Sequence, residues 1–392
     1  MVPMGAIRFA DQPAPKETKR MGANHAPNKI EVNRPFVALN ALAYIKQVLE
    51  SSWLSPGGPM AHAFEAKLGE YVGGQAMLVN SGTSALEMAI RAAARVYGVK
   101  EGSIVVPAYT CPDCAISVIK AGFKPVFADV DPQRLCITAE SLEMVAAAVK
   151  DVVGVMVIHL YGMTPALDVY QVARSRGIFI VDDVAEGIGA RPGGFNLLDL
   201  TDVAITSLRG EKPLPTGTGG VVMTRHEGIA GMVQSMVGLN SPKGFNRYYT
   251  FDMAYSYEYP ELLAALGLAQ LEMYPAMVQE RRALAQQYRE AGVTHYFDTS
   301  TDIPWKLPVR VMDSRKAWET ARLAGVEVSP PHWPLHQLPF LRKYHQISPT
   351  VTSKYMLPVS ESLRAKMVAF PLWPGMTPEQ VGRVVSVVNA VT

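Results

Sequence analysis

Short apolar runs separated by helix-forming stretches dominate the chain between Phe36 and Arg225. The runs cover residues 76–79, 103–107, 125–128, 152–159, 177–181 and 221–224. Runs this short and this uniformly apolar are typical of strands buried on both faces, and helices connect parallel strands. The alternation therefore predicts βαβ units and an α/β fold, in which helices cover both faces of a mainly parallel sheet.

Small and hydroxyl-bearing residues follow the first of these runs. The segment Asn80-Ser-Gly-Thr-Ser84 leads into residues 85–94, which are almost all good helix formers. Ser81, Gly82, Thr83 and Ser84 are therefore expected at a helix N-terminus, where unpaired amides and the helix dipole favour an anion such as phosphate. Alone, such a segment is more often an ordinary helix cap.

Two adjacent acids, Asp182 and Asp183, follow the run 177–181. This is the carboxyl end of a predicted parallel strand, where open α/β sheets place their ligand sites. Neighbouring strand residues point to opposite faces, so one acid can enter a site while the other faces away, for example toward a helix cap. The alternative is that both are solvated residues of a strand-to-helix turn.

Lys212 lies in a segment that cannot continue as a helix, because Pro213, Pro215, Gly217 and Gly219 follow it. A lysine in such a loop is usually a surface residue. Its position after the hydroxyl-rich turn and the acid pair suggests a catalytic role instead. A lysine, a carboxylate and a phosphate-binding turn are the groups that pyridoxal phosphate requires from an enzyme.

These segments and their order resemble the DegT/DnrJ/EryC1/StrS family of sugar aminotransferases. The resemblance extends from Asn33 to the C-terminus and also covers Glu50-Ser-Ser-Trp-Leu-Ser-Pro-Gly-Gly-Pro59, Val106-Pro-Ala-Tyr-Thr110, Lys124-Pro-Val-Phe-Ala-Asp129, His159-Leu-Tyr-Gly162 and Ala264-Ala-Leu-Gly-Leu-Ala-Gln-Leu271. It implies the pyridoxal phosphate-dependent transferase fold type I, with a mainly parallel seven-stranded sheet between helices and a smaller α+β domain. The expected parts are an N-terminal arm (1–32), a large domain (33–255), and a bridging helix with the small domain (256–392).

The resemblance also implies the site. Lys212 should form the Schiff base with pyridoxal 5'-phosphate, and Asp183 should pair with the pyridine nitrogen; these are the two expected catalytic residues. The other implied cofactor-binding positions are Gly82, Thr83, Ser84, Cys111, Glu186, Ser207 and Ser256. No metal is expected. Family members are dimers in which each subunit contributes to its neighbour's site, so a homodimer is expected.

Four positions depart from the family pattern. Cys111 stands where most members have an aromatic residue stacked on the cofactor ring, and Glu186 stands where Gln or His is usual. In the segment expected to cross the dimer interface, Ser256-Tyr-Glu258 replaces Asn-Tyr-Arg, which reverses a charge. These departures indicate a divergent branch.

The implied activity is transfer of an amino group from L-glutamate or L-glutamine to a ketosugar, with a nucleotide-linked one as the first expectation. Pyridoxamine 5'-phosphate is the expected intermediate, and ping-pong kinetics are expected. Such reactions serve amino-sugar, polysaccharide or antibiotic biosynthesis. One alternative is an aminotransferase for a cyclic ketone without a nucleotide, such as a ketocyclitol. Another is a binding or regulatory protein that keeps the fold without the chemistry.

Two further motifs have competing interpretations. Cys111-Pro-Asp-Cys114 has the spacing of a redox dithiol or half a zinc site, yet the only other cysteine is Cys136. His332 and His336 are four residues apart, but Pro334 between them argues against a metal-binding helix. Packed or pocket-lining side chains are the simpler expectation in both cases.

Composition excludes several classes of protein. The formal net charge is +2 and no basic stripe is present, so no nucleic-acid partner is expected. Three cysteines in 392 residues do not suggest a disulfide-built secreted protein, and no apolar run approaches a membrane span. A cytoplasmic location follows. In the C-terminal part, a long helix is expected over residues 259–291, strands over 309–311 and 326–328, and a final amphipathic helix from Thr377.

Overall fold

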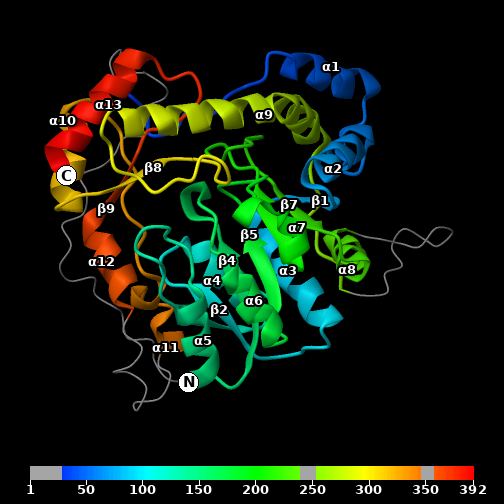
Figure 1. The fold of residues 1–392 in the computed structure, drawn as a ribbon. Coiled ribbons are helices and arrows are strands. Elements are labelled where there is room, and N and C mark those ends of the chain that lie inside the picture. Colours follow the sequence, from blue (N-terminus) through cyan, green and yellow to red (C-terminus); the bar gives the residue numbers. More distant parts are fainter. Residues whose placement is uncertain (1–28, 239–252, 346–356) are drawn as a thin grey trace, which may run out of the picture.

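The computed structural model describes residues 29–238, 253–345 and 357–392, and Figure 1 shows the arrangement of their elements. The larger part is a seven-stranded sheet in the order β1-β7-β6-β5-β4-β2-β3. Its strands are β1 (Gln75–Val79), β2 (Ser103–Pro107), β3 (Lys124–Ala128), β4 (Val152–Ile158), β5 (Phe179–Asp183), β6 (Val203–Ser207) and β7 (Gly220–Thr224). All neighbouring pairs are parallel except those of β7, which runs antiparallel to β1 and β6. The expected α/β fold with a mainly parallel sheet is confirmed.

Helices cover both faces of the sheet, so most residues of the central strands are buried. The helices of this part are α1 (Ala41–Ser51), α2 (Pro59–Val72), α3 (Gly82–Val96), α4 (Pro112–Lys120), α5 (Ala139–Ala148), α6 (Asp168–Ser175), α7 (Leu197–Leu200) and α8 (Glu227–Val237), with short 3₁₀ turns at Leu160–Gly162 and Pro192–Gly194. One core contains residues of α3, α4 and α8, and the other contains residues of α2, α5 and α6. Successive residues of a strand enter opposite cores, as the two-residue period requires.

A single long helix, α9 (Glu261–Glu290), connects this part to the C-terminal elements. In Figure 1 it runs from the blue helices α1 and α2 to the red helix α13. Pro260 precedes its first residue, as expected for a helix that begins after a proline. The predicted long helix over 259–291 is confirmed within two residues at its start and one at its end.

The C-terminal elements include a two-stranded antiparallel sheet of β8 (Leu307–Arg310) and β9 (Met367–Phe370). Around it lie α10 (Ser314–Leu323), a 3₁₀ turn (Leu335–Gln337), α11 (Arg342–His345), α12 (Pro358–Lys366) and α13 (Pro378–Val391). Thr377 and Gln380 form a capping box at the start of α13, so the predicted final helix is confirmed.

The predicted strand over 326–328 is wrong. Only isolated bridges occur here, from Val326 to Ile30 and from Ser329 to Ala369. The alternating apolar pattern is satisfied because Val326 and Val328 are buried, but no neighbouring chain segment continues the ladder. Of the expected N-terminal arm, residues 1–28 lie outside the described residues, and Ile30 packs in the core beside Val326 of the same chain.

Candidate active site

A pocket of about 450 Å³ lies at the carboxyl ends of the parallel strands. Its volume falls within the range of about 300–1,000 Å³ that is usual for small-molecule sites. Seven of the positions expected from the sequence line it: Gly82, Thr83, Cys111, Asp183, Glu186, Ser207 and Lys212. The topology brings them together, because they lie at or just after the carboxyl ends of β1, β2, β5 and β6, at the same edge of the sheet.

The phosphate-type turn forms the N-terminus of α3. The hydroxyl of Ser81 accepts a hydrogen bond from the Ser84 amide at 3.1 Å and caps the helix. The Ser84 hydroxyl donates to Oδ1 of Asn80 at 2.7 Å, so this side chain serves the turn and does not line the pocket. The amides of Gly82 and Thr83 belong to the first turn of α3, where no intrahelical acceptor exists.

Gly82 and Ser207 lie against each other on the pocket floor. A Cβ atom on Gly82 would come within 2.9 Å of Ser207 Cβ and 3.1 Å of its Oγ, closer than side chains normally approach. The glycine thus lets the helix start and the end of β6 meet. Together they present backbone amides and a hydroxyl to the same part of the pocket, a donor set that suits a phosphate.

Asp183 is the acid of β5 that enters the pocket. Its Oδ1 accepts from the Ala185 amide at 2.9 Å, and its Oδ2 accepts from the Cys114 thiol at 3.6 Å. Burial raises the pKa of this carboxyl above its ordinary value, while the Ala185 amide and the charge of Lys212 act in the opposite direction. A buried carboxylate gains from a cationic partner, which a protonated pyridine nitrogen provides.

Asp182 faces the opposite side of the sheet, as the strand period predicts. Its Oδ1 is bonded to Nε2 of His159 at 2.7 Å and accepts from the Tyr170 hydroxyl at 2.9 Å. The suggestion that this acid caps a helix is wrong, because its carboxylate is hydrogen-bonded to a buried histidine and a buried tyrosine. His159 and Asp182 are completely buried, so the trio is a polar link inside the core.

Lys212 projects into the pocket from the loop between β6 and β7. Its Nζ lies 2.9 Å from Oε1 of Glu186, and both side chains are largely buried. Burial alone would lower the pKa of Lys212, but the charge and hydrogen bond of Glu186 outweigh it and raise that pKa. Burial likewise opposes ionisation of Glu186, yet the Lys212 ammonium lowers the pKa of the carboxyl.

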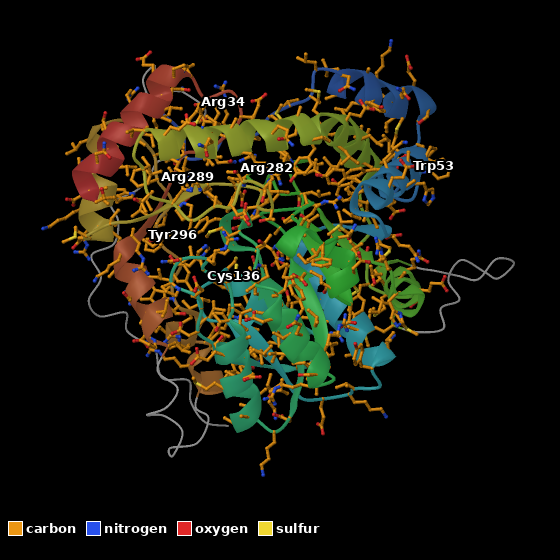
Figure 2. All side chains as sticks on the ribbon, viewed as in Figure 1. Arg34, Trp53, Cys136, Arg282, Arg289 and Tyr296 are labelled. Atoms are coloured by element: carbon orange, nitrogen blue, oxygen red, sulfur yellow. The ribbon has the colours of Figure 1, made fainter. Side chains whose placement is uncertain are left out.

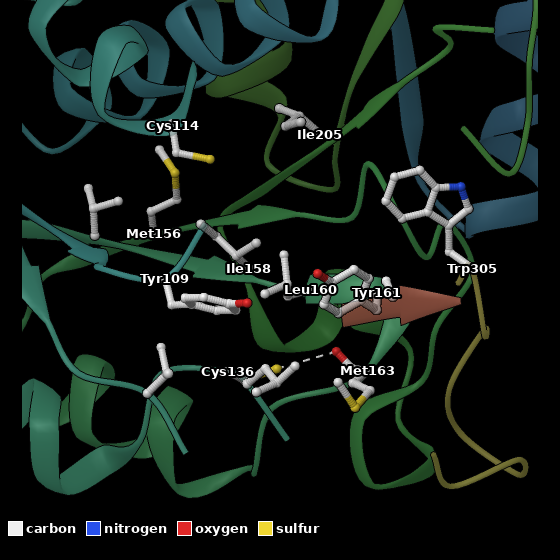
Figure 3. Close-up of a cluster of buried hydrophobic side chains, with 14 of the residues drawn as sticks. Tyr109, Cys114, Cys136, Met156, Ile158, Leu160, Tyr161, Met163, Ile205 and Trp305 are labelled. Carbon is white, nitrogen blue, oxygen red and sulfur yellow. Dashed lines mark hydrogen bonds between the residues drawn. The ribbon is translucent and has the colours of Figure 1, made fainter. Parts of the chain in front are cut away.

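Trp305 forms an aromatic wall beside Lys212 that sequence reasoning missed. The Lys212 ammonium lies 4.2 Å from the centroid of the indole, which stacks on Tyr161 with centroids 6.5 Å apart. Figure 3 shows these two rings side by side near Tyr109. Trp305 precedes β8, about ninety residues after Lys212, and no motif marks it. The signal available in the sequence was that Trp305 comes just before the predicted strand 309–311.

His332 also lines the pocket, where its ring lies 5.6 Å edge-on from Tyr109 and 5.9 Å from Tyr161. Burial, together with the charges of Lys212 and Lys306, lowers the pKa of His332 to about 4, although Glu186 opposes this. His336 instead pairs with Glu361 at 3.0 Å. The two histidines therefore have separate partners.

The Cys-x-x-Cys motif starts α4. Cys111 lies at the N-cap and lines the pocket, and Cys114 lies one turn later beside Asp183. All three cysteines are free thiols, and Figure 3 shows Cys136 bonded to the Met163 carbonyl. Burial raises the pKa of Cys111 to about 11, which leaves its thiol protonated and weakly reactive. Among the described residues, no group of three or more potential metal ligands occurs.

Ser256 and Glu258 do not line the pocket of their own chain. Both are exposed, on the segment that precedes α9. Tyr257 between them anchors the segment, because its hydroxyl donates to Glu87 of α3 at 3.1 Å. Glu87 also binds Lys120 and Arg91, at 2.7 and 3.0 Å. The anchor holds Ser256 and Glu258 facing outward.

None of the helices in the described part of the chain is long and apolar enough to cross a membrane.

Comparison with known proteins identifies the fold and the family. The chain is 27% identical over 368 residues to GDP-perosamine synthase of Vibrio cholerae, covering 90% of this chain and 96% of the relative. Two solved structures share the fold at a TM-score of 0.81. One is a DegT DnrJ EryC1 StrS aminotransferase from Brucella abortus (24% identity, 90% of this chain and 95% of that one). The other is Helicobacter pylori PseC, an aminotransferase of pseudoaminic acid biosynthesis (17%, 92% and 98%).

A family model matches residues 37–389, which is most of the chain, and its description is the DegT/DnrJ/EryC1/StrS aminotransferase family. The structural neighbours are pyridoxal phosphate-dependent enzymes of fold type I, so the expected fold class is confirmed. The chain belongs to the DegT/DnrJ/EryC1/StrS family and is a pyridoxal phosphate-dependent aminotransferase.

Proposed function

We propose that this protein binds pyridoxal 5'-phosphate and transfers an amino group from L-glutamate or L-glutamine to a ketosugar, most simply a nucleotide-linked one. Similar proteins support the acceptor class, since one is named a GDP-perosamine synthase and another a spore coat polysaccharide biosynthesis protein. The pocket supports the cofactor, because its donors, carboxylate and lysine match the phosphate, the ring nitrogen and the aldehyde of pyridoxal phosphate.

Each group has a proposed role. The amides of Gly82 and Thr83 and the hydroxyl of Ser207 hold the phosphate, while Asp183 holds the ring nitrogen in its protonated form. Lys212 carries the cofactor and then moves protons as a free amine. When bound, the cofactor supplies the electron sink that makes the Cα proton of the donor acidic. Trp305 and His332 line the space beside Lys212 that is left for the acceptor.

The observation that carries the proposal is the convergence of Lys212, Asp183 and the α3 N-terminus on one pocket. The test is the visible absorption spectrum of the purified protein with pyridoxal phosphate, before and after L-glutamate. A yellow band that needs Lys212 and is bleached by glutamate supports the proposal. Lys212→Ala should lose the band. Lys306→Ala, which removes the neighbouring buried lysine, should keep it. A colourless wild-type protein would favour the binding-protein alternative.

A ketocyclitol acceptor is the second candidate, and the charges of the pocket favour it. Four acids line the pocket, Asp113, Asp183, Glu186 and Glu211, and among the described residues its lysine and arginine side chains are Arg209 and Lys212. Glu258 also stands where the family has arginine. A diphosphate needs cationic partners. Single-turnover assays of the aminated cofactor form with ketosugar nucleotides and with ketocyclitols distinguish the two classes.

We further propose a homodimer. Exposed apolar side chains gather on α1 and the segment before it: Val37, Leu39, Leu42 and Leu49. Figure 2 shows Trp53, half exposed, at the rim of the molecule beside α2. Contiguous apolar surface of this kind marks an association site. In the proposed dimer the exposed hydroxyl of Ser256 reaches the pocket of the partner.

A further inference from the structure

Glu186 makes the closest polar contact of the Lys212 amine. Oε1 lies 2.9 Å from Nζ, and Oε2 accepts the Tyr161 amide at 2.7 Å. The carboxylate is thus fixed at both oxygens. Tyr161 has a φ of 56°, which is uncommon for a residue with a side chain. Unusual backbone of this kind concentrates at functional sites.

The surroundings of the pair are mostly uncharged or already engaged. Asp183 is bonded to the Ala185 amide and the Cys114 thiol, and Cys111 is a protonated thiol. The indole of Trp305 lies against the ammonium, and Lys306, 4.0 Å from the centroid of the same ring, donates to Ser329. The neutral ring of His332 completes the set. Glu186 is therefore the carboxylate that hydrogen-bonds the Lys212 ammonium directly, whereas Asp183 acts on it through its charge.

We propose that Glu186 is the proton partner of Lys212: it holds the lysine as an ammonium ion when the amine is free, and it accepts that proton when a neutral amine is needed. In this transfer Lys212-NH₃⁺ and Glu186-COO⁻ become Lys212-NH₂ and Glu186-COOH, and the reverse transfer restores the pair. No other reactant is consumed. The glutamine or histidine usual in the family would not hold a negative charge here.

The catalytic consequence rests on the proposed function, whereas the ion pair itself belongs to the chain without cofactor. Only a neutral amine attacks a carbonyl carbon, so a buried ammonium must first lose its proton. Glu186 provides the acceptor inside the pocket, without solvent. Glu186 therefore keeps Lys212 in the unreactive ammonium form at neutral pH, and it also allows rapid conversion to the neutral amine by a single proton transfer.

The test measures the amine directly, in full-length protein freed of cofactor with hydroxylamine. Reductive methylation with formaldehyde modifies only neutral amines, and mass spectrometry reports the rate at Lys212 against pH. An ion pair at hydrogen-bonding distance shifts a pKa by about 1–3 units. Glu186→Gln should therefore accelerate labelling of Lys212 at pH 8 by about tenfold or more. Exposed Lys67 should be labelled at an unchanged rate in the same samples.

The pH profile separates this role from a structural one. Loss of the ion pair moves the midpoint of the labelling profile to lower pH, whereas a looser pocket raises the plateau without moving the midpoint. Gln keeps a carbonyl oxygen for the Tyr161 amide, and Glu186→His, the other residue usual in the family, is the second variant. Identical midpoints in all three proteins would overturn the proposal. Failure to bind pyridoxal phosphate would overturn the proposed function but leave this measurement intact.

Discussion

Asp182 and Asp183 are neighbours in the chain, yet they serve opposite faces of the sheet. Asp183 enters the pocket and Asp182 binds His159 and Tyr170 in the core behind it. The same substitution at the two positions should therefore have opposite effects. One acid belongs to the proposed chemistry and the other to the stability of the fold.

We expect Asp182→Asn to lower the free energy of unfolding by about 1–3 kcal/mol, because two hydrogen bonds to a buried carboxylate become neutral ones. Cofactor absorbance should remain. Asp183→Asn should unfold at a similar or higher denaturant concentration than the wild type, since burial disfavours its charge. Its transaminase activity should fall roughly 100-fold or more. Denaturant unfolding and single-turnover kinetics check both. Equal losses of stability in the two variants would contradict the assignment.

Acid should destabilise the protein through His332. Its pKa is about 4 in the folded chain and about 6.5 when exposed. Between these values the unfolded chain binds a proton that the folded chain does not, so stability falls as pH drops from 6.5 to 4 and is independent of this group above 6.5. The loss attributable to His332 is at most about 3 kcal/mol. His332→Gln should show a correspondingly shallower fall, measured by urea unfolding at pH 7, 5.5 and 4. Parallel curves for both proteins would contradict this prediction.

The apolar side chains of α1 give a prediction for assembly. Leu39→Asp with Leu42→Asp should shift the protein from dimer to monomer, because a charge replaces apolar surface that a partner covers. Leu323→Asp, on an equally exposed leucine at the end of α10, is the matched control and should leave the dimer intact. Size-exclusion chromatography with light scattering distinguishes the forms. A monomeric wild type would exclude a stable dimer.

The sequence was sufficient for the strands of the sheet that are uniformly apolar, and for the loop around Lys212, where prolines and glycines exclude a helix. It was insufficient for β6 and β9. Residues 203–207 end in threonine and serine, and β9 is four residues long, so neither stands out from its surroundings. Both form because a neighbouring strand supplies their hydrogen bonds.

The residues of the candidate site likewise fall into those that the sequence predicts and those that it does not. Lys212, Asp183 and the Ser81–Ser84 turn are recognisable because local chemistry and position along the strands mark them. Trp305 reaches the pocket only after the chain has returned from α9, so tertiary contacts alone bring it there. His332 lines the pocket too, which is one of the two outcomes expected for it from the sequence. The hydroxyl of Ser84 illustrates the converse: its residue type suits phosphate, but it donates to the side-chain oxygen Oδ1 of Asn80.

The start of α2 depends on a side chain from another helix. Gly58 at the N-cap has no side chain to cap the helix, and the buried carboxylate of Glu261 accepts the amides of Met60 and Ala61 at 2.5 and 3.1 Å. Glu261→Ala leaves these amides unpaired and should cost about 2–3 kcal/mol. Glu272→Ala, which removes an exposed glutamate of the same helix, should cost much less.

The effect of a substitution at Gly58 on stability should have opposite signs in the wild type and in the Glu261→Ala variant. Gly58 already has the extended backbone of an N-cap, but a Cβ there would lie 2.5 Å from Oε1 of Glu261 and 2.6 Å from the exposed Trp53 ring. Gly58→Ser should therefore destabilise the wild type. In Glu261→Ala the carboxylate is gone, Trp53 can turn aside, and the serine hydroxyl can cap α2, which should recover about 1 kcal/mol. Thermal unfolding of the four proteins completes a double-mutant cycle. Additive effects would show that the Glu261 carboxylate does not cap α2.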